Sequence, residues 1–356
     1  MKDKCGSNAL AFLLLLLPVV YLASCRSDKK EHDERTAAPA NKIQEAVSTR
    51  LLLPKTPDNF TIAFIGDQGP KANAVAVLKL IKDEGAEAVV HSGDFDYRGN
   101  PAAWDAQINA ILGADFPYFA SVGNHDEDKF YGTGGYQKYM IARMNRLGLT
   151  WDGDLGVKSS FVFHGIFFVL TAPDVFGFGH AGYIRDRLAK DQSVWSISSW
   201  HKNMHRMQVG GKSNDTGWGV YEEARKGSAV IATGHEHSYS RTHLLSSCKN
   251  QIVASISDTL ALSEDDPATP EDEGKTFVFV SGLGGKSIRD QEQAGDWWAS
   301  IYTSTQNATY GALFGVFNYE GKEGLAKFYF KNIDGAVVDE FYVKSNAIKP
   351  EDWTVR

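Results

Sequence analysis

From residue 59 onward, short apolar runs alternate with polar turns and with segments of helical periodicity. FTIAFIGD (60–67), EAVVHSGD (87–94) and PYFASVGNHD (117–126) each read as a buried strand that ends in polar residues. ANAVAVLKLIKDEG (72–85) and PAAWDAQINAILG (101–113) lie between them and carry apolar residues at helical spacing, the second starting on a proline. Three strand–turn–helix units in succession predict a layered α/β fold with a largely parallel core.

The second half of the chain predicts more strands. SFVFH (160–164) and IFFVLTA (166–172) read as neighbouring strands, AGYIRDRLAKD (181–191) as a helix, and VWSISSWH (194–201) and SAVIATGHEH (228–237) as strands that each end in histidine. TFVFVSGLGG (276–285) and residues 314–343 alternate apolar and polar positions, as antiparallel strands do. The acidic stretch 263–275 is low in apolar residues and predicts a mobile surface loop.

The N-terminus predicts export. Lys2 and Lys4 precede the 15-residue apolar run 9–23, which is too short to span a bilayer comfortably and has the layout of a signal peptide. The run closes with Leu-Ala-Ser-Cys, which resembles a bacterial lipobox and implies a lipid on Cys25; the alternative is an ordinary secretory signal with an incidental cysteine. The predicted boundaries are a signal peptide (1–24), a lipidated cysteine and flexible tether (25–57), one folded domain (58–348) and a tail (349–356).

Composition narrows the classes of partner. The 356 residues are 43% hydrophobic and carry a formal charge of -7, so binding nucleic acid by neutralising its phosphates is not expected. If Cys5 leaves with the signal and Cys25 is acylated, Cys248 remains alone, and the exported domain relies on its core without an internal disulfide. Cys248 is expected to be a buried or half-buried thiol.

Candidate chemistry gathers at five strand ends. In parallel sheets, ligands bind outside the carboxyl ends of the strands, and that is where these polar turns fall. The turns GDQG, GDFDY, GNHD, Trp-His and GHEH offer seven metal-binding side chains: Asp67, Asp94, Tyr97, Asn124, His201, His235 and His237. A mixed oxygen and nitrogen set without thiolate suits Fe, Zn or Mn, and one shared carboxylate would complete a two-metal site that hydrolyses phosphate esters.

These five blocks resemble those of the calcineurin-like metallophosphoesterases, specifically the purple acid phosphatase branch, over about residues 59–345. The resemblance implies a four-layer αββα sandwich of two mixed sheets, with a dinuclear site at the carboxyl ends of the strands. It implies that Asp67, Asp94, Tyr97 and His237 hold a first metal, ferric in the family. Asp94, Asn124, His201 and His235 would hold a second, Fe, Zn or Mn. Asp94 would bridge the two metals.

The implied reaction is hydrolysis of phosphomonoesters by a metal-bound hydroxide, with His125 protonating the leaving oxygen. Two alternatives stay open: a phosphodiesterase that acts on nucleotides or lipid headgroups with the same site, and a non-catalytic binding lipoprotein. The expected partners are a small phosphate ester and, through Cys25, a membrane, with the outer membrane favoured because Arg26 is not the aspartate associated with inner-membrane retention.

Several polar residues near these motifs have two interpretations. His205 rivals His201 as a ligand, and Trp297 and Trp298 either roof the site or pack. His91 is interpreted as a residue behind the ligands or in the core. Asp96 is expected to cap its own turn. Asp126 and Glu236 are interpreted as orienting or surface carboxylates.

Overall fold

Two mixed sheets form the centre of the domain. The computed structural model describes residues 54–265 and 273–345, all within the unit Ala46–Arg356. One sheet has seven strands, in the order β12 (Thr259–Ala261), β19 (Val337–Lys344), β18 (Leu325–Asn332), β17 (Gly311–Phe317), β1 (Phe60–Ile65), β2 (Ala88–His91) and β3 (Tyr118–Ala120). The other has eight, in the order β16 (Trp298–Tyr302), β9 (Tyr239–Thr242), β15 (Val278–Ser281), β8 (Val230–Thr233), β7 (Trp195–Ser199), β6 (Ile166–Thr171), β5 (Lys158–Phe163) and β4 (Asp152–Asp154).

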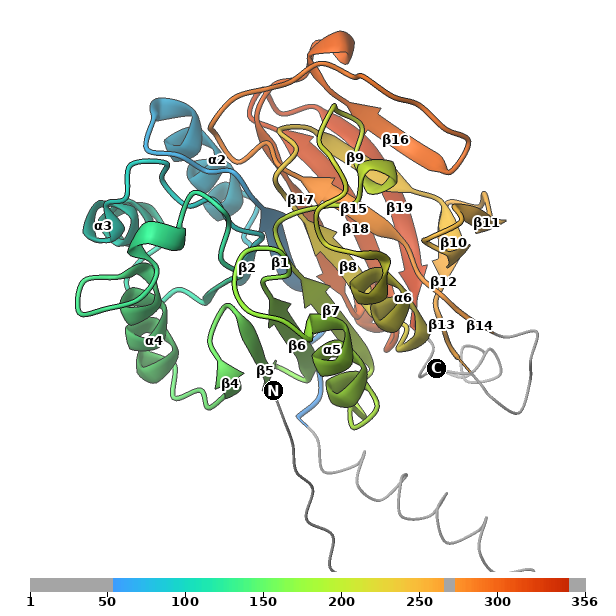
Figure 1. Ribbon diagram of the computed structural model, residues 1–356, viewed down its shortest axis with the longest axis horizontal. Coiled ribbons are helices and arrows are strands. Elements are labelled where there is room, and N and C mark those ends of the chain that lie inside the picture. The colour runs from blue at the N-terminus through green and yellow to red at the C-terminus, as the bar shows by residue number, and fades with distance from the viewer. Residues whose placement is uncertain (1–53, 266–272, 346–356) are drawn as a thin grey trace, which may run out of the picture. The chain divides into compact units, whose positions relative to one another are not determined.

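Helices cover the outer faces of both sheets (Figure 1). Three of them, α2 (Ala72–Asp83), α3 (Pro101–Ile111) and α4 (Tyr136–Arg146), belong to the seven-stranded side, and α5 (His180–Leu188) and α6 (Trp218–Lys226) pack on the eight-stranded sheet. Between the sheets, the ring of Phe64 lies 5.2 Å from that of Phe279, and the ring of Phe119 lies 5.3 Å from that of Phe168. The expected four-layer αββα sandwich is confirmed.

Most predicted elements are present, with informative exceptions. The strands of the first three units are parallel neighbours, and α3 begins at Pro101 with Asn100 accepting a hydrogen bond from the amide of Ala103 at 3.1 Å. The purely antiparallel interpretation of TFVFVSGLGG is wrong, because β15 pairs parallel to β8 and antiparallel to β9. The acidic stretch is not all loop: its ends form the paired strands β13 (Ser263–Asp265) and β14 (Glu273–Lys275). Helices α4 and α6 were not predicted.

A buried ionic contact joins the two sheets. The guanidinium of Arg241 on β9 donates to both carboxylate oxygens of Asp339 on β19, at 2.7 and 2.9 Å, and the Tyr239 hydroxyl donates to the same carboxylate at 2.6 Å. Arg241 is 2% exposed and also stacks 4.0 Å above the ring of Phe341. Bidentate geometry and burial make this contact a directional link between layers that otherwise meet through apolar side chains.

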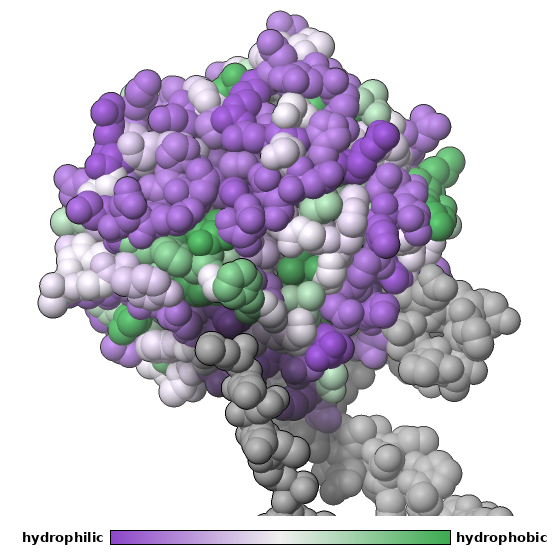
Figure 2. Space-filling model, in the orientation of Figure 1, coloured by the Kyte–Doolittle hydropathy of each residue, from purple (hydrophilic) through white to green (hydrophobic). Residues whose placement is uncertain are grey.

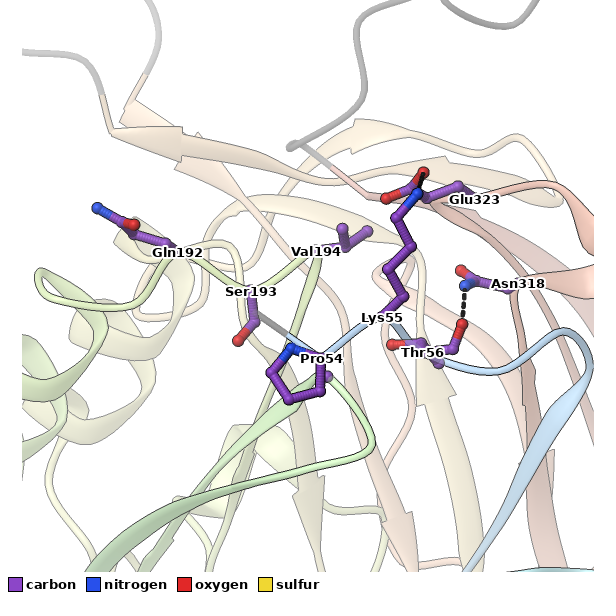
Figure 3. Close-up of a pocket in the computed structure, with 9 residues that line it drawn as sticks. Pro54, Lys55, Thr56, Gln192, Ser193, Val194, Asn318 and Glu323 are labelled. Carbon is purple, nitrogen blue, oxygen red and sulfur yellow. Dashed lines mark hydrogen bonds and ion pairs between the residues drawn. The ribbon is translucent and has the colours of Figure 1, made fainter. Parts of the chain in front are cut away.

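The described chain enters the domain beside a small cavity (Figure 3). Asn318 donates to the carbonyl of Thr56 at 2.8 Å, and Lys55 lies 4.0 Å from Glu323. The cavity has a volume of about 40 Å³, enough for little more than a water molecule, and none of the predicted metal ligands lines it. The contacts around the cavity anchor the start of the described chain. The cavity itself is too small for a substrate.

The predicted signal peptide 1–24, the lipidated Cys25 and nearly all of the predicted tether lie outside the described residues. So does the tail 349–356. Within 54–265 and 273–345, we find no helix with the length and apolar character that a bilayer crossing requires. Cys248 is fully buried, as expected.

Candidate metal centre

Both sheets contribute to one cluster of polar side chains. In the seven-stranded sheet, the parallel strands β1, β2 and β3 end immediately before the turns that carry Asp67, Asp94 and Asn124. In the eight-stranded sheet, the parallel strands β7 and β8 end one residue before Trp200-His201 and Gly234-His235. The carboxyl ends of strands from two packed layers therefore supply the candidate ligands.

The first group comprises Asp67, Tyr97 and His237. The Tyr97 hydroxyl donates to Asp67 Oδ1 at 2.8 Å and lies 3.0 Å from His237 Nε2. The same histidine nitrogen lies 3.2 Å from Asp67 Oδ1, and its Nδ1 contacts the hydroxyl of Ser287. A carboxylate, a phenol and an imidazole thus point their polar atoms at a common position, with Ser287 orienting the imidazole.

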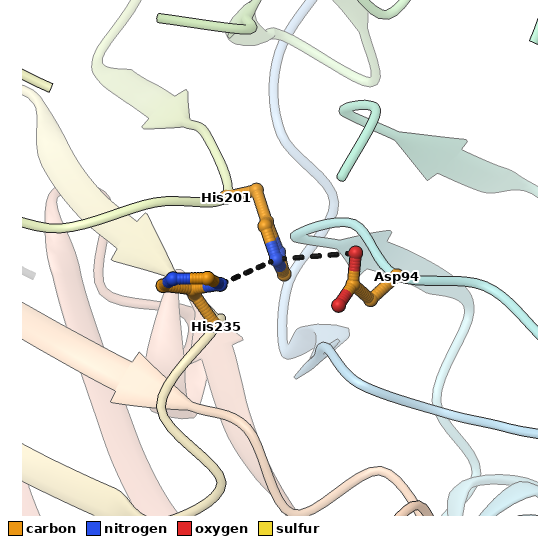
Figure 4. Close-up of side chains that lie close together, drawn as sticks. All are labelled: Asp94, His201 and His235. Carbon is orange, nitrogen blue, oxygen red and sulfur yellow. Dashed lines mark hydrogen bonds and ion pairs between the residues drawn. The ribbon is translucent and has the colours of Figure 1, made fainter. Parts of the chain in front are cut away.

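The second group comprises Asp94, His201 and His235 (Figure 4). One potential ligand atom from each of these buried residues lies within 4.8 Å of the other two. His201 Nε2 is 3.2 Å from Asp94 Oδ1 and 3.1 Å from His235 Nδ1. His201 Nδ1 donates to the carbonyl of Ser92 at 2.7 Å, which leaves Nε2 as the nitrogen facing the group.

The two groups are connected. The backbone amide of His235 in the second group donates to Asp67 Oδ2 in the first at 2.9 Å. Asp94 acts on both sides, because its carboxylate contacts His201 and also raises the pKa of Tyr97. This is the placement that a bridging carboxylate needs.

Asn124 provides an independent test of whether a cation fits. Its side-chain Oδ1 is buried and has no hydrogen-bond partner among the described residues. A buried amide oxygen without a partner is costly, and a hard cation at that position would satisfy it. Together with the carboxylates, imidazoles and phenol, this orphaned acceptor fits a site for Fe, Zn or Mn.

The structure separates His201 from its rival. His205 lies on a 3-10 turn, where its Nδ1 bonds to the carbonyl of Lys212 at 2.7 Å, and it does not join the group of Asp94, His201 and His235. His125 is the most exposed of the predicted residues: its side chain is 55% accessible. Its Nε2 lies 4.0 Å from Asp94 Oδ2, and its ring lies 4.7 Å from that of Tyr97.

Buried carboxylates and imidazoles shift one another's pKa in this cluster. Burial would lower the pKa of His201, but the Asp94 and Asp67 carboxylates outweigh burial and raise it to about 9. Burial would raise the pKa of Asp94, but His201 and His125 hold it below its usual range. Burial, His201 and Lys212 lower the pKa of His235 to about 2. His201 binds a metal only as the neutral imidazole, so a cation and a proton would compete for its Nε2.

Backbone conformation at the candidate ligands is unusual. Asp67, Asp94, Tyr97 and His235 all have positive φ, between 54° and 69°. Non-glycine residues rarely occupy this left-handed region, and such strain clusters at functional sites. Positive φ at four of seven predicted ligands is therefore consistent with a site held by its surroundings.

Asp126 holds the Asp94 turn in place. Its carboxylate accepts three backbone hydrogen bonds, from Asp94 at 2.9 Å, Phe95 at 2.9 Å and Gly123 at 2.8 Å. Asp126 is fully buried, so the surface interpretation is wrong and the orienting one holds. Burial and the Asp94 carboxylate raise its pKa, which the Phe95 and Gly123 amides oppose.

Other motif residues have structural roles. Asp96 caps its own turn, as expected, accepting from the amides of Arg98, Gly99 and Asn100. His91 is fully buried in the core. Trp297 donates to the carbonyl of Arg206, and both tryptophans pack, with no contact to the candidate ligands in the described chain.

Glu236 completes this set of motif residues and is not a surface residue either. It is 1% exposed and lies 3.3 Å from Arg289.

Sequence reasoning missed a group of cations near the ligands, Lys212, Lys286 and Arg289, which we call the cationic rim. Lys286 Nζ lies 4.0 Å from the centre of the Tyr97 ring, and its backbone amide donates to the carbonyl of Asp67 at 3.0 Å. Arg289 donates to the carbonyl of His235 at 3.3 Å, and Lys212 contributes to the low pKa of His235. The glycine pair 284–285 after β15 was the available sequence signal for the Lys286–Arg289 turn.

A family model described as calcineurin-like phosphoesterase matches residues 60–239, just over half of the chain. No match was found among curated proteins. Among solved structures, a purple acid phosphatase from yellow lupin (Lupinus luteus) seeds aligns with a TM-score of 0.60 and 16% identity, over 83% of this chain and 55% of that one. PhoD aligns with a TM-score of 0.47 and 12% identity, over 81% and 73%.

The lupin enzyme therefore shares the fold, and this chain spans little more than half of its length. The matched family range includes all seven predicted ligands and His125. It ends at Tyr239, so Lys286 and Arg289 of the cationic rim lie beyond it.

The support for the Asp94 turn yields a prediction. In Asp126→Asn, a single amide oxygen replaces two carboxylate oxygens, so at least one of the three backbone bonds is lost. Loss of such support around ligands typically costs about 10- to 100-fold in metal affinity, and we expect a loss of about tenfold for Zn²⁺ or Mn²⁺, measured by chelator competition. Asp128→Asn, at an exposed carboxylate of the same turn, is the control and should bind metal as the wild type does. Equal affinities in the two variants would contradict the assigned role.

Proposed function

Because this chain belongs to the calcineurin-like phosphoesterase family, we propose that it is a metal-dependent phosphatase that hydrolyses phosphomonoesters. The observation that carries the proposal is the pair of connected ligand groups, Asp67–Tyr97–His237 and Asp94–His201–His235, with the orphaned Asn124 oxygen beside them. A binding protein that had lost catalysis would not need to keep every one of these polar side chains gathered in one cluster.

Each ligand group would hold one cation. Asp67, Tyr97 and His237 would hold the first and Asn124, His201 and His235 the second, with Asp94 shared between them. When bound, such a pair lowers the pKa of coordinated water and neutralises charge on the phosphoryl oxygens. The chain's own contribution is to fix the ligand positions and to exclude water from them.

His125 is placed to serve the leaving group. Its backbone amide donates to Asp94 Oδ1 at 2.9 Å, which fixes the residue over the shared carboxylate. Its ring leans on Tyr97, while more than half of its side chain stays open to solvent and substrate. An imidazole in this position can protonate a departing alkoxide or phenoxide.

The cationic rim favours monoesters over diesters. A phosphomonoester carries close to two negative charges at neutral pH and a diester carries one, so added positive charge at the rim discriminates between them. Lys212 is half-buried. Its burial and the nearby Arg289 lower its pKa, and the carboxylates of Glu236, Asp67 and Asp94 act in the opposite direction.

The loops that carry the rim are fastened to the site. Gly210 and Gly211 pack so closely on Glu236 and Glu292 that an added Cβ would lie 2.4 and 2.3 Å from their side chains. The Gln293 amide bridges the same loop by donating to the carbonyls of Gln208 and Gly210. Lys212 is therefore presented by a supported loop.

The metal pair is proposed to include ferric iron. Burial and the Asp67 and Asp94 carboxylates raise the pKa of Tyr97 far above that of a free phenol, so the phenolate needs a strongly charged cation to form. A trivalent ion at Asp67, Tyr97 and His237 meets this need, with Fe, Zn or Mn at the second position. Tyrosine ligation of this kind gives a visible charge-transfer band in the family that the motifs resemble.

We also propose that the protein is exported and anchored through a lipid on Cys25. The support is the sequence alone: a basic start, a 15-residue apolar run and a lipobox-like end. A membrane tether of charged and alanine-rich residues would hold the phosphatase domain near the surface of the membrane.

The function is tested with a substrate panel. With two metal ions per chain, the purified protein should hydrolyse a generic aryl phosphate, lose activity to a chelator and recover it with iron, zinc or manganese. Asp94→Ala should lower the rate by at least about a thousandfold, because metal assistance supplies several kcal/mol. A bis-aryl phosphate hydrolysed faster than the monoester would favour the diesterase, and metal content well below two ions together with no hydrolysis would exclude the enzyme.

The tyrosine assignment is tested by colour. Tyr97→Phe removes only the phenol oxygen, so we expect the iron-loaded variant to lose its visible absorption band while still binding iron through Asp67 and His237. Absorption spectra and iron content of both proteins provide the comparison. A band of the same position and intensity in the variant would remove Tyr97 from the ligand set.

The anchor is tested by fractionation. Cys25→Ser abolishes the acylation site, so we expect the variant to leave the membrane fraction and appear as a soluble exported protein. Continued retention in membranes would count against lipidation of Cys25.

A further inference from the structure

A cavity of about 350 Å³ opens where the amino-terminal ends of α5 and α6 meet. Its walls come from the turn 173–179 before α5 and the loop 215–217 before α6. Its apolar lining comes from Pro173, Phe178, Ala181 and Val220, and its polar groups are Asp174, His180, Asp215 and Thr216. The volume falls in the usual range for small-molecule sites, about 300–1,000 Å³.

The cavity adjoins the second ligand group. Asp215 in its wall places Oδ2 3.6 Å from His235 Nε2, the ring nitrogen that faces away from His201. Lys202 directly follows the candidate ligand His201, and its Nζ lies 2.6 Å from Asp174 Oδ2 in the opposite wall. A group held in the cavity therefore lies next to residues that adjoin the second ligand group.

Hydrogen bonds fix this wall to the ligand turns. The amide of Asp215 donates to the carbonyl of Asn203 at 3.1 Å, and the Asn203 side chain donates to the carbonyl of Gly234 at 2.7 Å. Tyr221 on α6 donates to the same asparagine at 2.8 Å. The cavity wall and the ligand turns are thus connected through the hydrogen bonds of Asn203.

Phe178 stands at the mouth of the cavity and is 92% exposed, the highest value among the large apolar residues of the described chain. Figure 2 shows a hydrophobic area within a largely hydrophilic face of the molecule. A phenylalanine ring with this exposure is available to stack on a ligand. It is flanked by Gly177 and Gly179, which have φ of 71° and 77° and let the turn project it outward.

Charge limits what the cavity accepts. Lys202 neutralises Asp174, while the Asp215 carboxylate is balanced by no cation among the described lining residues. The Asp215 carboxylate repels an anionic group, which would bind more favourably at the cationic rim. An uncharged planar ring fits the apolar walls and the exposed phenylalanine.

We propose that this cavity receives the uncharged aromatic or heterocyclic leaving group of the substrate, with Phe178 stacking on its ring. The inference rests on the proposed phosphatase function and narrows it to aryl or heterocyclic phosphomonoesters. The phosphoryl group lies at the metal centre and the cationic rim, and the ring extends past Asp215 into the cavity.

The test compares two non-hydrolysable probes on the metal-loaded full-length protein: 1-naphthylphosphonate, which has the ring, and methylphosphonate, which has none. Dissociation constants are measured by calorimetry. Phe178→Ala should weaken 1-naphthylphosphonate by about tenfold, the upper range for one aromatic contact, and leave methylphosphonate within about twofold. Ile256→Ala, at a residue 75% exposed outside the cavity lining, is the matched control and should change neither constant.

A second variant fills the cavity. Thr216→Trp, at a half-buried position of the wall, should block 1-naphthylphosphonate and spare methylphosphonate. Equal losses for both probes in Phe178→Ala, or no loss for either, would overturn the leaving-group site. Failure of the metal-loaded wild type to bind methylphosphonate would instead count against the proposed phosphatase function, so the two failures are distinguishable.

Discussion

The close approach of three backbone turns sets the conditions for everything else in this site. An added Cβ on Gly123 would lie 2.2 Å from the amide nitrogen of Asp94, and one on Gly93 would lie 2.8 Å from Gly123 and from the His201 ring. Only glycine permits such contacts, and the crowding brings ligands from two sheets within bonding distance of common points. In these motifs, the glycine allows the turns to approach one another, and this close approach positions the carboxylate that follows.

That crowding has an energetic cost that neighbouring bonds offset. Four candidate ligands sit in the left-handed region, and each such residue costs of order 1–3 kcal/mol. The ladder between β1 and β2 continues past the strands, as the amides of Asp67, Gln68 and Gly69 donate to the carbonyls of Gly93, Asp94 and Phe95. Together with the three bonds to Asp126, this ladder holds conformations that the turns would not adopt alone.

The candidate ligands could be predicted from the sequence because their positions depend on local signals. Apolar runs that end in Gly-Asp, Gly-Asn or histidine locate strand ends, and parallel strands gather their ends on one edge. The proximity of Asp94 and His201 is therefore predictable from the sequence. The choice of His201 over His205 followed from where an apolar run stops. Lys212 had no comparable signal, and the glycine pair 284–285 marks only a turn before Lys286 and Arg289; a cation in a loop is usually solvated. The burial of Asp126 depends on turns that are distant in the chain, and the mixed pairing of β15 depends on which strands flank it.

The loop 208–217 places opposite charges near the second ligand group. Lys212 and Asp215 lie three residues apart, and both act on His235: the ammonium lowers its pKa, and the carboxylate lies 3.6 Å from its Nε2. Opposite charges on one supported loop create a field gradient across the second ligand group. A monoester has the same polarity, with its charge on the phosphoryl oxygens and none on its leaving group, so the gradient favours one orientation. Because strand ends fix the ligands while loops supply this gradient, substrate preference can change through the loops without disturbing the metal centre.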